Sequence, residues 1–474
     1  MLRKIRIILA ALCFAGITLL FLGIGRDWWG FLPKLQLLPA AMRVIGGATL
    51  GNAAVLSGIL LLTLLAGRIY CSVLCPLGVF QDLVIWIRRR LGKHIRPLRK
   101  KFGYSAELAW LRYAVAALFI ICIVFDIQIV VALLGPYSAY GRMVMSLLGG
   151  SPAPVVIAAV LTFAVTAVCA FLWGRAYCNA VCPVGTVLGS ISRYQIFAPV
   201  IDSAKCIKCG SCARECKASC IDDKNERIDY SRCVDCFDCI GNCRTGAISF
   251  GRVRRHSDAV AESVPESADK GRRAFLNSSA VLIAGAAGTA VAHAQEMKLD
   301  GGLAEVKPKS ALERKPRLVP PGASGEKHFY SRCTACQLCV AACPNGVLRP
   351  STDAGHLMQP QMGYEKGFCR PECTACSEVC PTGAIVPVTR EAKTLIHIGT
   401  AAVDPSLCFA ATGEEKCGSC ARHCPTGAIS MVETDGTRRP VVAEAQCIGC
   451  GKCEYLCPAR PISAITVKGL SKHI

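Results

Sequence analysis

Four long apolar stretches dominate the first 175 residues of the chain. They cover residues 5–24, about 44–66, about 107–125 and 154–173, and they contain few charged side chains. Each is close to the roughly 20 residues that an α-helix needs to cross a bilayer. The pattern therefore predicts an α-helical membrane domain over residues 1–200 with four spans.

The first stretch has a second interpretation, because it follows Met-Leu-Arg-Lys and resembles the start of a cleaved signal peptide. No small-residue cleavage site follows it. Instead the chain continues with Trp28 and Trp29, and tryptophan is typical of the membrane interface. We therefore interpret residues 5–24 as a retained span.

Basic residues give the expected orientation. The loop after the second span contains a dense basic run, which consists of Arg88, Arg89, Arg90, Lys93, Arg96, Arg99, Lys100 and Lys101. The loops on the opposite side contain few cations. The positive-inside rule places this loop and residues 201–270 in the cytoplasm. The net charge of +21 is then a matter of topology and of contact with anionic lipid, and no nucleic-acid partner is expected.

Polarity changes again after residue 252. Residues 253–270 are polar and predict a linker, and residues 271–295 begin with Gly-Arg-Arg-Ala-Phe-Leu and continue as a short Ala/Gly-rich apolar run. This combination is typical of a twin-arginine export signal, here internal, which would serve as a fifth span. We interpret it as an uncleaved anchor, with cleavage after Ala294 as the alternative. Residues 296–327 predict a second linker, and residues 328–474 a periplasmic domain.

Cysteines carry the candidate chemistry. The chain has 32, and most of them fall into six compact motifs of four. A disulfide scaffold is the first alternative, but cysteines two or three residues apart converge on one cofactor more readily than they form separate bridges. Zinc is the second alternative. Repeated motifs with x2 and x3 gaps favour six [4Fe–4S] clusters in α+β domains of the bacterial ferredoxin type.

Residues 201–252 contain two motifs with the two-cluster ferredoxin spacing, in which the fourth cysteine of each motif reaches the other cluster. The predicted ligands of the two clusters are Cys206, Cys209, Cys212 and Cys243, and Cys233, Cys236, Cys239 and Cys216. Lys217 and Arg244 replace the usual proline after the fourth cysteine. Cys220 is left over and is expected to be a packed or free thiol, with substitution for Cys216 as the alternative.

Residues 328–474 contain four more motifs, and all four end in Cys-Pro. Their cysteines are Cys333, Cys336, Cys339 and Cys343; Cys369, Cys373, Cys376 and Cys380; Cys408, Cys417, Cys420 and Cys424; and Cys447, Cys450, Cys453 and Cys457. The second and third motifs have a longer first gap. Two pairings stay open: first with second and third with fourth, or first with fourth and second with third.

The membrane domain contains an internal repeat, because residues 67–78 and 174–185 match closely and each ends a predicted span. Each copy has a Cys-x3-Cys-Pro motif, with Cys71 and Cys75 in one and Cys178 and Cys182 in the other. In a helix, residues four apart share a face, and the proline tends to break the helix after the second cysteine. Three interpretations stay open: redox dithiols, a jointly held metal or cluster, and a structural corner.

Several motifs are missing from the sequence. There is no Cys-x2-Cys-His haem site, no Rossmann or phosphate-binding loop, and no histidine in the four predicted spans. Electron transfer is therefore expected to use iron–sulfur clusters and a quinone. The candidate quinone-binding residues are Arg26, Asp27 and Asp126, which lie towards the outer face with Trp28, Tyr137 and Tyr140.

The first 250 residues resemble the NapH-type membrane quinol dehydrogenase component, with four spans, two Cys-x3-Cys-Pro motifs and a two-cluster ferredoxin. Residues 271–474 resemble the NapG/MauM-type periplasmic ferredoxin proteins, which combine a twin-arginine signal with four cluster motifs. The fusion of both in one chain departs from either family. The resemblance implies that quinol is oxidised and that electrons pass to a periplasmic reductase or cytochrome. An accessory redox or maturation factor for a periplasmic enzyme is the alternative.

Overall fold

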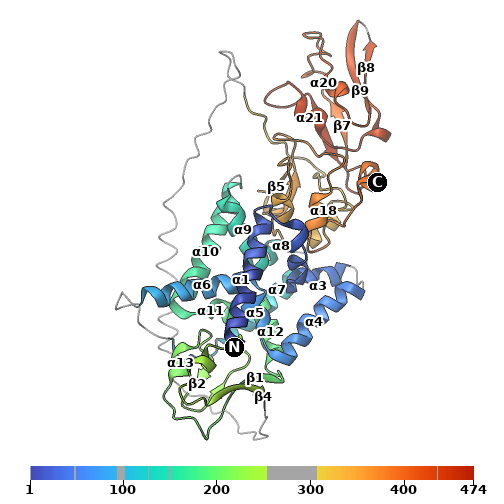
Figure 1. Cartoon of the computed structure of the whole chain (residues 1–474). Coiled ribbons are helices and arrows are strands. Elements are labelled where there is room, and N and C mark those ends of the chain that lie inside the picture. Colours follow the sequence, from blue (N-terminus) through green and yellow to red (C-terminus); the bar gives the residue numbers. More distant parts are fainter. Residues whose placement is uncertain are drawn as a thin grey trace.

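The computed structural model describes residues 2–46, 50–92, 102–125, 127–148, 151–253, 307–434 and 436–474. The predicted twin-arginine segment 271–295 and almost all of the linker 253–270 lie outside these residues. Figure 1 shows a group of helices in the middle of the molecule, with a small unit at one end and a larger C-terminal unit at the other. We call residues 197–253 the first ferredoxin unit and residues 307–474 the C-terminal unit.

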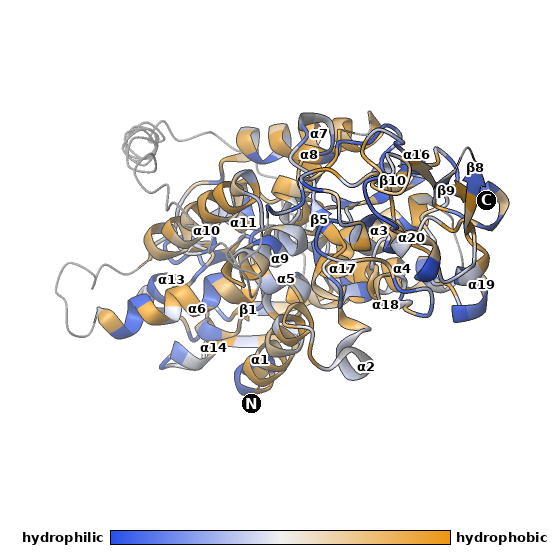
Figure 2. Ribbon diagram, turned by 90° about the horizontal axis from the view of Figure 1, so that it is seen from above, coloured by the Kyte–Doolittle hydropathy of each residue, from blue (hydrophilic) through white to orange (hydrophobic). Residues whose placement is uncertain are grey.

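Four long helices coincide with the four predicted apolar stretches. They are α1 (Leu2–Phe21), α4 (Leu50–Ala66), α7 (Ala109–Val124) and α10 (Ala153–Trp173). Within the described part of the chain, two helices, α1 and α10, are long and apolar enough to cross a bilayer, and just 33% and 22% of their most apolar 18-residue segments are buried. Figure 2 shows these helices as largely hydrophobic. Exposed apolar helix surface of this extent is typical of contact with lipid or another protein, and four spans stay a prediction.

Shorter helices fill the space between the long ones. They are α2 (Arg26–Trp29), η1 (Leu32–Leu35), α3 (Leu37–Gly46), α8 (Gln128–Leu134) and α9 (Pro136–Leu147). Every residue of α9 from Pro136 to Val144 is buried. This helix packs against α1, α6 and α10, so it forms the centre of the helical domain.

The internal repeat has a crossed arrangement. Its cysteine segments form α5 (Ile69–Val73) with α6 (Pro76–Leu91), and α11 (Ala176–Ala180) with α12 (Pro183–Ser192). Helix α6 packs against α10 and α12 packs against α4, so the last helix of each copy contacts the long helix of the other. Pro76 and Pro183 do not simply end a helix. Each opens the next one at its first position, where a missing N–H costs nothing.

The first ferredoxin unit is small and α+β. Strand β1 (Phe197–Ile201) pairs antiparallel with β4 (Ile248–Arg252), and β2 (Ile221–Asp222) pairs with β3 (Arg227–Ile228). Two one-turn helices, α13 (Ser211–Glu215) and α14 (Asp238–Asn242), each contain the third cysteine of a motif and end just before the fourth. The unit lies against the start of α1, where Arg3 and Asp238 form an ion pair at 2.9 Å.

The C-terminal unit contains two ferredoxin-like halves. The first half consists of α16 (Glu326–Arg332), α17 (Leu338–Ala341), β5 (Leu348–Pro350), η3 (Ala354–His356), β6 (Pro360–Met362), α18 (Ala375–Val379) and α19 (Arg390–Leu395). The second half consists of β7 (Gly399–Val403), α20 (Ser419–Arg422), β8 (Ile429–Thr434), β9 (Thr437–Val442), η4 (Glu444–Gln446), α21 (Lys452–Leu456) and β10 (Ile465–Gly469). Antiparallel pairs join β5 to β6, β7 to β10 and β8 to β9. The predicted ferredoxin-type architecture is thus present in both halves.

Part of the expected second linker belongs to the C-terminal unit. Leu318, Val319 and Ala323 are buried in its core. Nε of Arg314 donates a hydrogen bond to the carbonyl of Val467 at 2.9 Å, and its guanidinium pairs with Glu454. Residues 307–327 therefore do not form a free linker, although their polar and proline-rich composition suggested one.

Candidate metal centres

The first ferredoxin unit brings its eight motif cysteines into two cavities. Site 1 is lined by the first three cysteines of one motif and the last of the other: Cys206, Cys209, Cys212 and Cys243. Site 2 has the complementary set: Cys216, Cys233, Cys236 and Cys239. The structure groups these cysteines as the spacing predicts, with the fourth cysteine of each motif crossing to the other site.

Site 2 contains a fifth thiol. Cys220 lines the same cavity, and its Sγ atom is 3.5 Å from Sγ of Cys216. Its side chain is buried, as expected of a packed thiol. Its spacing fits neither motif, and its position beside Cys216 keeps open the alternative that it substitutes for Cys216 as a ligand.

The C-terminal unit pairs its first motif with its second and its third with its fourth. Site 3 groups Cys380 with Cys333, Cys336 and Cys339, because Cys380 packs against the apolar core that contains the other three. The other three sites are cavities. Site 4 is lined by Cys343, Cys369, Cys373 and Cys376; site 5 by Cys424, Cys447, Cys450 and Cys453; and site 6 by Cys408, Cys417, Cys420 and Cys457. This selects one of the two pairings that the spacing left open.

The four motifs with regular gaps share one backbone conformation. The residues on either side of the second cysteine of each motif have positive φ. These residues are Lys208 and Gly210, Asp235 and Phe237, Ala335 and Gln337, and Gly449 and Gly451. Positive φ is uncommon for residues other than glycine and marks sites where the surroundings impose it. Such turns direct successive backbone N–H groups into one concavity and favour an anion there. The two stretched motifs lack this conformation, with φ of −107° at Thr374 and −164° at Gly418.

The donor groups around these cavities fit iron–sulfur clusters. Backbone N–H groups point at cysteine sulfur, as in Ile385 to Cys380 and Ala401 to Cys447, both at 3.4 Å. Hydrogen bonds to ligand sulfur tune the reduction potential of such clusters. Next to site 3, the buried hydroxyl of Tyr137 has no hydrogen-bond partner among the described residues. A bound cluster would supply one-electron chemistry and acceptors for such donors.

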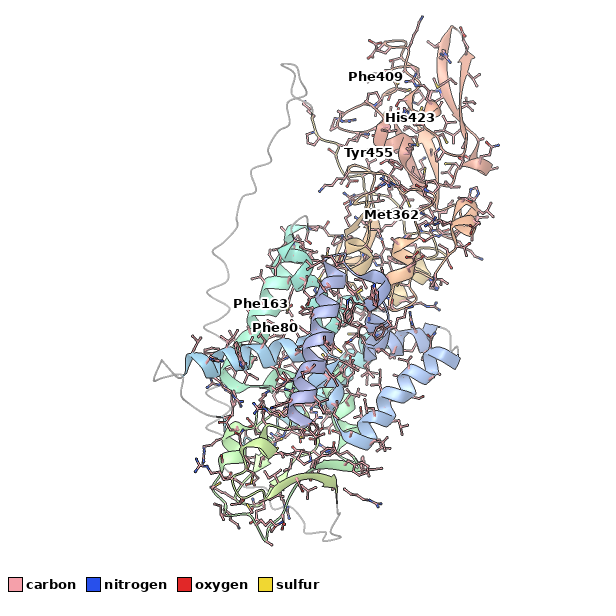
Figure 3. The ribbon with its side chains drawn as sticks, viewed as in Figure 1. Phe80, Phe163, Met362, Phe409, His423 and Tyr455 are labelled. Atoms are coloured by element: carbon pink, nitrogen blue, oxygen red, sulfur yellow. The ribbon has the colours of Figure 1, made fainter. Side chains whose placement is uncertain are left out.

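Sites 3 to 6 form a row. Cys369 and Cys376 of site 4 pack against the apolar core that contains Cys339 of site 3. The N–H of Cys369 in site 4 donates to the carbonyl of Cys450 in site 5 at 2.9 Å. Burial and neighbouring thiols, Cys420 of site 6 among them, raise the pKa of Cys453 in site 5. In Figure 3, Met362, Tyr455, His423 and Phe409 follow this row away from the helices.

Site 3 rests directly on the helical domain. Its cysteines share one apolar core with Phe21 of α1 and with Tyr137 and Tyr140 of α9. Nη2 of Arg43 reaches the carbonyl of Cys380 at 3.4 Å, and Nε2 of Gln128 donates to the carbonyl of Ser331 at 2.8 Å. The row of sites therefore begins where the C-terminal unit contacts helices α1, α3, α8 and α9.

The four cysteines of the internal repeat also come together. Cys71, Cys75, Cys178 and Cys182 are all buried where the two copies cross. Burial and then the other three thiols raise the pKa of Cys75 well above its ordinary value. Nε2 of Gln81 donates to Sγ of Cys178 at 3.2 Å. We call these four cysteines the thiol centre.

Two buried arginines cross over at the thiol centre. Arg68 of the first copy donates to the carbonyl of Cys178 at 3.2 Å, and Arg175 of the second donates to the carbonyl of Cys71 at 2.9 Å. Arg175 also pairs with Asp82 at 2.9 Å. Although burial opposes ionisation of Asp82, Arg175, Lys217 and Arg6 hold the pKa of this carboxyl well below its ordinary value. Sequence reasoning missed these arginines, and their repetition at equivalent positions was the signal that pointed to them.

The candidate quinone residues are not tested by this structure. Asp126 lies outside the described residues, as do the side chains of Arg26 and Asp27. Trp28 is exposed, and the hydroxyl of Tyr140 lies 2.6 Å from Oγ1 of Thr18. Of the residues named with them, only Tyr137 and Tyr140 lie beside a metal site.

Comparisons with known proteins agree on iron–sulfur chemistry. Residues 49–94 and 155–199 match a 4Fe-4S binding domain family, and residues 332–390 and 415–460 match two 4Fe-4S dicluster domain families. The first match covers both copies of the thiol-centre repeat. The chain therefore contains iron–sulfur domains in both its helical and its C-terminal parts.

Individual relatives include ferredoxin-type proteins. NapF of Escherichia coli K12 is 32% identical over 155 residues, which is 32% of this chain and 86% of NapF. NapG of the same organism is 33% identical over 177 residues, which is 33% of this chain and 75% of NapG. The methylamine utilization ferredoxin-type protein MauN of Methylobacillus flagellatus is 29% identical over 196 residues, and the chain spans 63% of its length. No solved structure matches the chain.

Proposed function

The chain belongs to the family of 4Fe–4S ferredoxin-type proteins that includes NapF and NapG, and we propose that it is a membrane-bound quinol dehydrogenase component. In this proposal a NapH-type membrane part is fused to a NapG/MauM-type periplasmic part. Six [4Fe–4S] clusters occupy sites 1 to 6. Quinol gives up electrons at the helical domain, and the C-terminal unit delivers them to a periplasmic reductase or cytochrome.

The placement of the two ferredoxin units supports a membrane-spanning arrangement. Helix α1 has 20 residues, which corresponds to about 30 Å and to the thickness of a bilayer core. Arg3 at its start pairs with Asp238 of the first ferredoxin unit, and Phe21 at its end packs beside site 3. Sites 1 and 2 would then face the cytoplasm, and sites 3 to 6 the periplasm.

The observation that carries the proposal is the row of sites 3 to 6 that starts on the helical domain. Site 3 is buried against α1 and α9, whereas site 6 lies with Phe409 at the far end of the C-terminal unit (Figure 3). A row of clusters that begins in the helical domain and ends far from it suits electron transfer from the membrane part to a partner. The residues around site 3 hold that end in place, and the surface near site 6 is where we expect the partner to bind.

The test uses membranes that contain the full chain. A quinol analogue is added without oxygen, and reduced clusters are followed by electron paramagnetic resonance (EPR). We expect quinol to reduce the clusters of the C-terminal unit, with dithionite as the reference for full reduction. If dithionite reduces them and quinol never does, the protein is not a quinol dehydrogenase component.

The alternative is an accessory redox or maturation factor for a periplasmic enzyme. The similarity to MauN and MauM, both named for methylamine utilization, favours it. In that case quinol would leave the clusters oxidised. Deletion of the protein would leave the partner enzyme present but without its finished cofactor.

A further inference from the structure

The thiol centre lies among buried positive charges that the visible carboxylates do not balance. Arg68 is fully buried, and its guanidinium donates to Oδ1 of Asn179 at 2.8 Å and to two backbone carbonyls, those of Ser231 and Cys178. Among the described residues it forms no ion pair with a carboxylate. Asp235 is close, but its carboxylate accepts the backbone N–H of Arg68, at 3.1 Å. A buried charge without a counter-charge is costly.

The second arginine has only a share of a counter-charge. Arg175 pairs with Asp82, and the same carboxylate also pairs with Arg6 at 2.9 Å and with Lys217 at 3.5 Å. Lys217 has a second partner in Asp238, which also pairs with Arg3 and Arg89. Arg89 also pairs with Glu215 at 3.3 Å. Even so, the five cations of this network outnumber its three carboxylates, and a further anion nearby would be stabilised.

Both arginines reach the cysteine segments, and Arg68 also lies beside a sulfur atom. Nη2 of Arg68 lies 3.9 Å from Sγ of Cys71. Both guanidiniums bind the carbonyl of the first cysteine in the opposite repeat copy. Neutral thiols, or a disulfide between them, would leave Arg68 without a counter-charge and Arg175 with only its share of Asp82. Deprotonated thiolates would supply the missing charge, and four thiolates converge stably when they share a metal centre.

We propose that Cys71, Cys75, Cys178 and Cys182 together hold a seventh iron–sulfur cluster, flanked by Arg68 and Arg175. An oxidised [4Fe–4S] cluster with four thiolate ligands carries about two negative charges, which matches the two arginines. Each repeat copy supplies two ligands, so neither copy forms a site alone. This resolves the three interpretations of the Cys-x3-Cys-Pro motifs in favour of a shared cluster.

The two halves of the site differ in one donor. Gln81 of the first copy donates a hydrogen bond through Nε2 to Sγ of Cys178 at 3.2 Å. The equivalent position in the second copy is Leu188, which has no polar group to offer Cys71. A hydrogen bond to a ligand sulfur stabilises the reduced, more negative state of a cluster. Gln81 is therefore a positioning residue that raises the potential of this cluster.

The location of the thiol centre suits an electron relay. On one side, Val234 and Cys236 of the site 2 motif pack into the same core as Cys71 and Cys75. On the other side, Ala139 and Met143 of α9 pack into the core that contains Cys71 and Cys75. A Cβ atom at Gly141 of the same helix would lie 2.4 Å from the carbonyl oxygen of Cys336 in site 3. Helix α9 thus lies between the thiol centre and Cys336 of site 3. The relay role rests on the proposed function, in which quinol supplies single electrons. The presence of the cluster does not depend on that function.

The test measures iron, sulfide and Mössbauer spectra of the full chain purified in detergent. We expect C75S and C182S each to lose about four iron atoms per chain, roughly one seventh of the total, and the double variant to lose no more. The matched controls are C122A and C169A, which remove cysteines of the same helical domain outside the centre and should lose no iron. Unchanged iron in C75S and C182S would overturn the proposal. So would a reversible disulfide among the four cysteines, found by mass spectrometry.

A second variant tests the proposal even if the cysteine variants fail to fold. Q81L copies the leucine of the other repeat, so we expect normal iron content and a lower reduction potential for one cluster signal. L188M is the control and should shift none. If Q81L leaves every cluster potential unchanged, the thiol centre holds no cluster beside Gln81. Seven clusters that quinol does not reduce would refute the proposed function and leave this site intact.

Discussion

Gly141 lies where site 3 rests on the helical domain, and a methyl group there tests that contact. A Cβ atom at this position would lie 2.4 Å from the carbonyl oxygen of Cys336 and 2.6 Å from Cζ of Phe21. The Phe21 ring cannot easily swing aside. It is buried and packs against Tyr137 and Tyr140, with ring centroids 5.8 and 6.4 Å away. The G141A variant must therefore shift the backbone of site 3 away from α9.

The expected magnitude follows from two opposing effects. Overpacking a well-packed contact costs about 1–3 kcal/mol. Alanine in place of glycine within a helix contributes about 1 kcal/mol of stability. The added alanine stabilises helix α9 itself, whereas the overpacking destabilises the contact between α9 and Cys336. Docking of the C-terminal unit is therefore weakened by about 1–3 kcal/mol, which is roughly 5- to 150-fold in the docking equilibrium.

The assay compares the rate at which quinol reduces the C-terminal clusters with the rate for dithionite. We expect G141A to slow the quinol reaction, to leave cluster content and dithionite reduction unchanged, and to make residues 307–327 easier to cleave with protease. The control is G58A in α4, where a Cβ would meet nothing within 4 Å. If G141A is reduced by quinol at the wild-type rate and is equally resistant to protease, site 3 does not dock on α9.

Four further predictions concern other parts of the chain. D82N removes the carboxylate shared by Arg6, Arg175 and Lys217, so thermal unfolding in detergent should show a loss of about 3–5 kcal/mol, whereas D202N at an exposed ion pair should show almost none. C216S should keep the site 2 cluster because Cys220 lies 3.5 Å away and can replace the ligand, whereas C239S should lose it; equal loss of site 2 iron in both variants would refute this. Burial lowers the pKa of His473 to about 4, so the unfolded chain takes up its proton first and the C-terminal unit should lose stability as pH falls from about 6.5 towards 4. H473Q should flatten that pH dependence in thermal melts and H423Q should not; an unchanged profile in H473Q would count against a buried neutral imidazole. Replacing Arg272 and Arg273 with Lys should block export of a reporter fused after residue 300, and continued export would argue against a twin-arginine signal.

The sequence predicted the local parts of the sites well. In the first ferredoxin unit the regular gaps force three cysteines of each motif around one cavity and send the fourth to the other, and the structure has this arrangement. In the C-terminal unit the same rule did not fix which motifs pair. The inserted residues before Cys373 and Cys417 change where the chain leaves the motif, and only tertiary packing brings Cys380 beside Cys333.

Contacts between distant segments were beyond the sequence. The repeat was visible, but the crossing of its copies was not, because Arg68 meets Cys178 across 110 residues. Cys220 looked like a spare thiol until the fold placed it in the site 2 cavity. Residues 307–327 have the composition of a linker, yet Leu318 and Val319 are buried. The average composition of a segment indicates how exposed it is as a whole. It does not show that a few apolar residues, here Leu318 and Val319, are buried.

The most direct test of the central claim asks whether electrons from quinol must pass site 3 before they reach sites 4 to 6. C336S removes a ligand from the site nearest the helical domain, and C457S removes one from the site at the far end. EPR of membranes treated with quinol should show that C336S leaves sites 4 to 6 oxidised while dithionite still reduces them. C457S should leave sites 3 to 5 reducible by quinol. Quinol reduction of sites 4 to 6 at the wild-type rate in C336S would contradict the account.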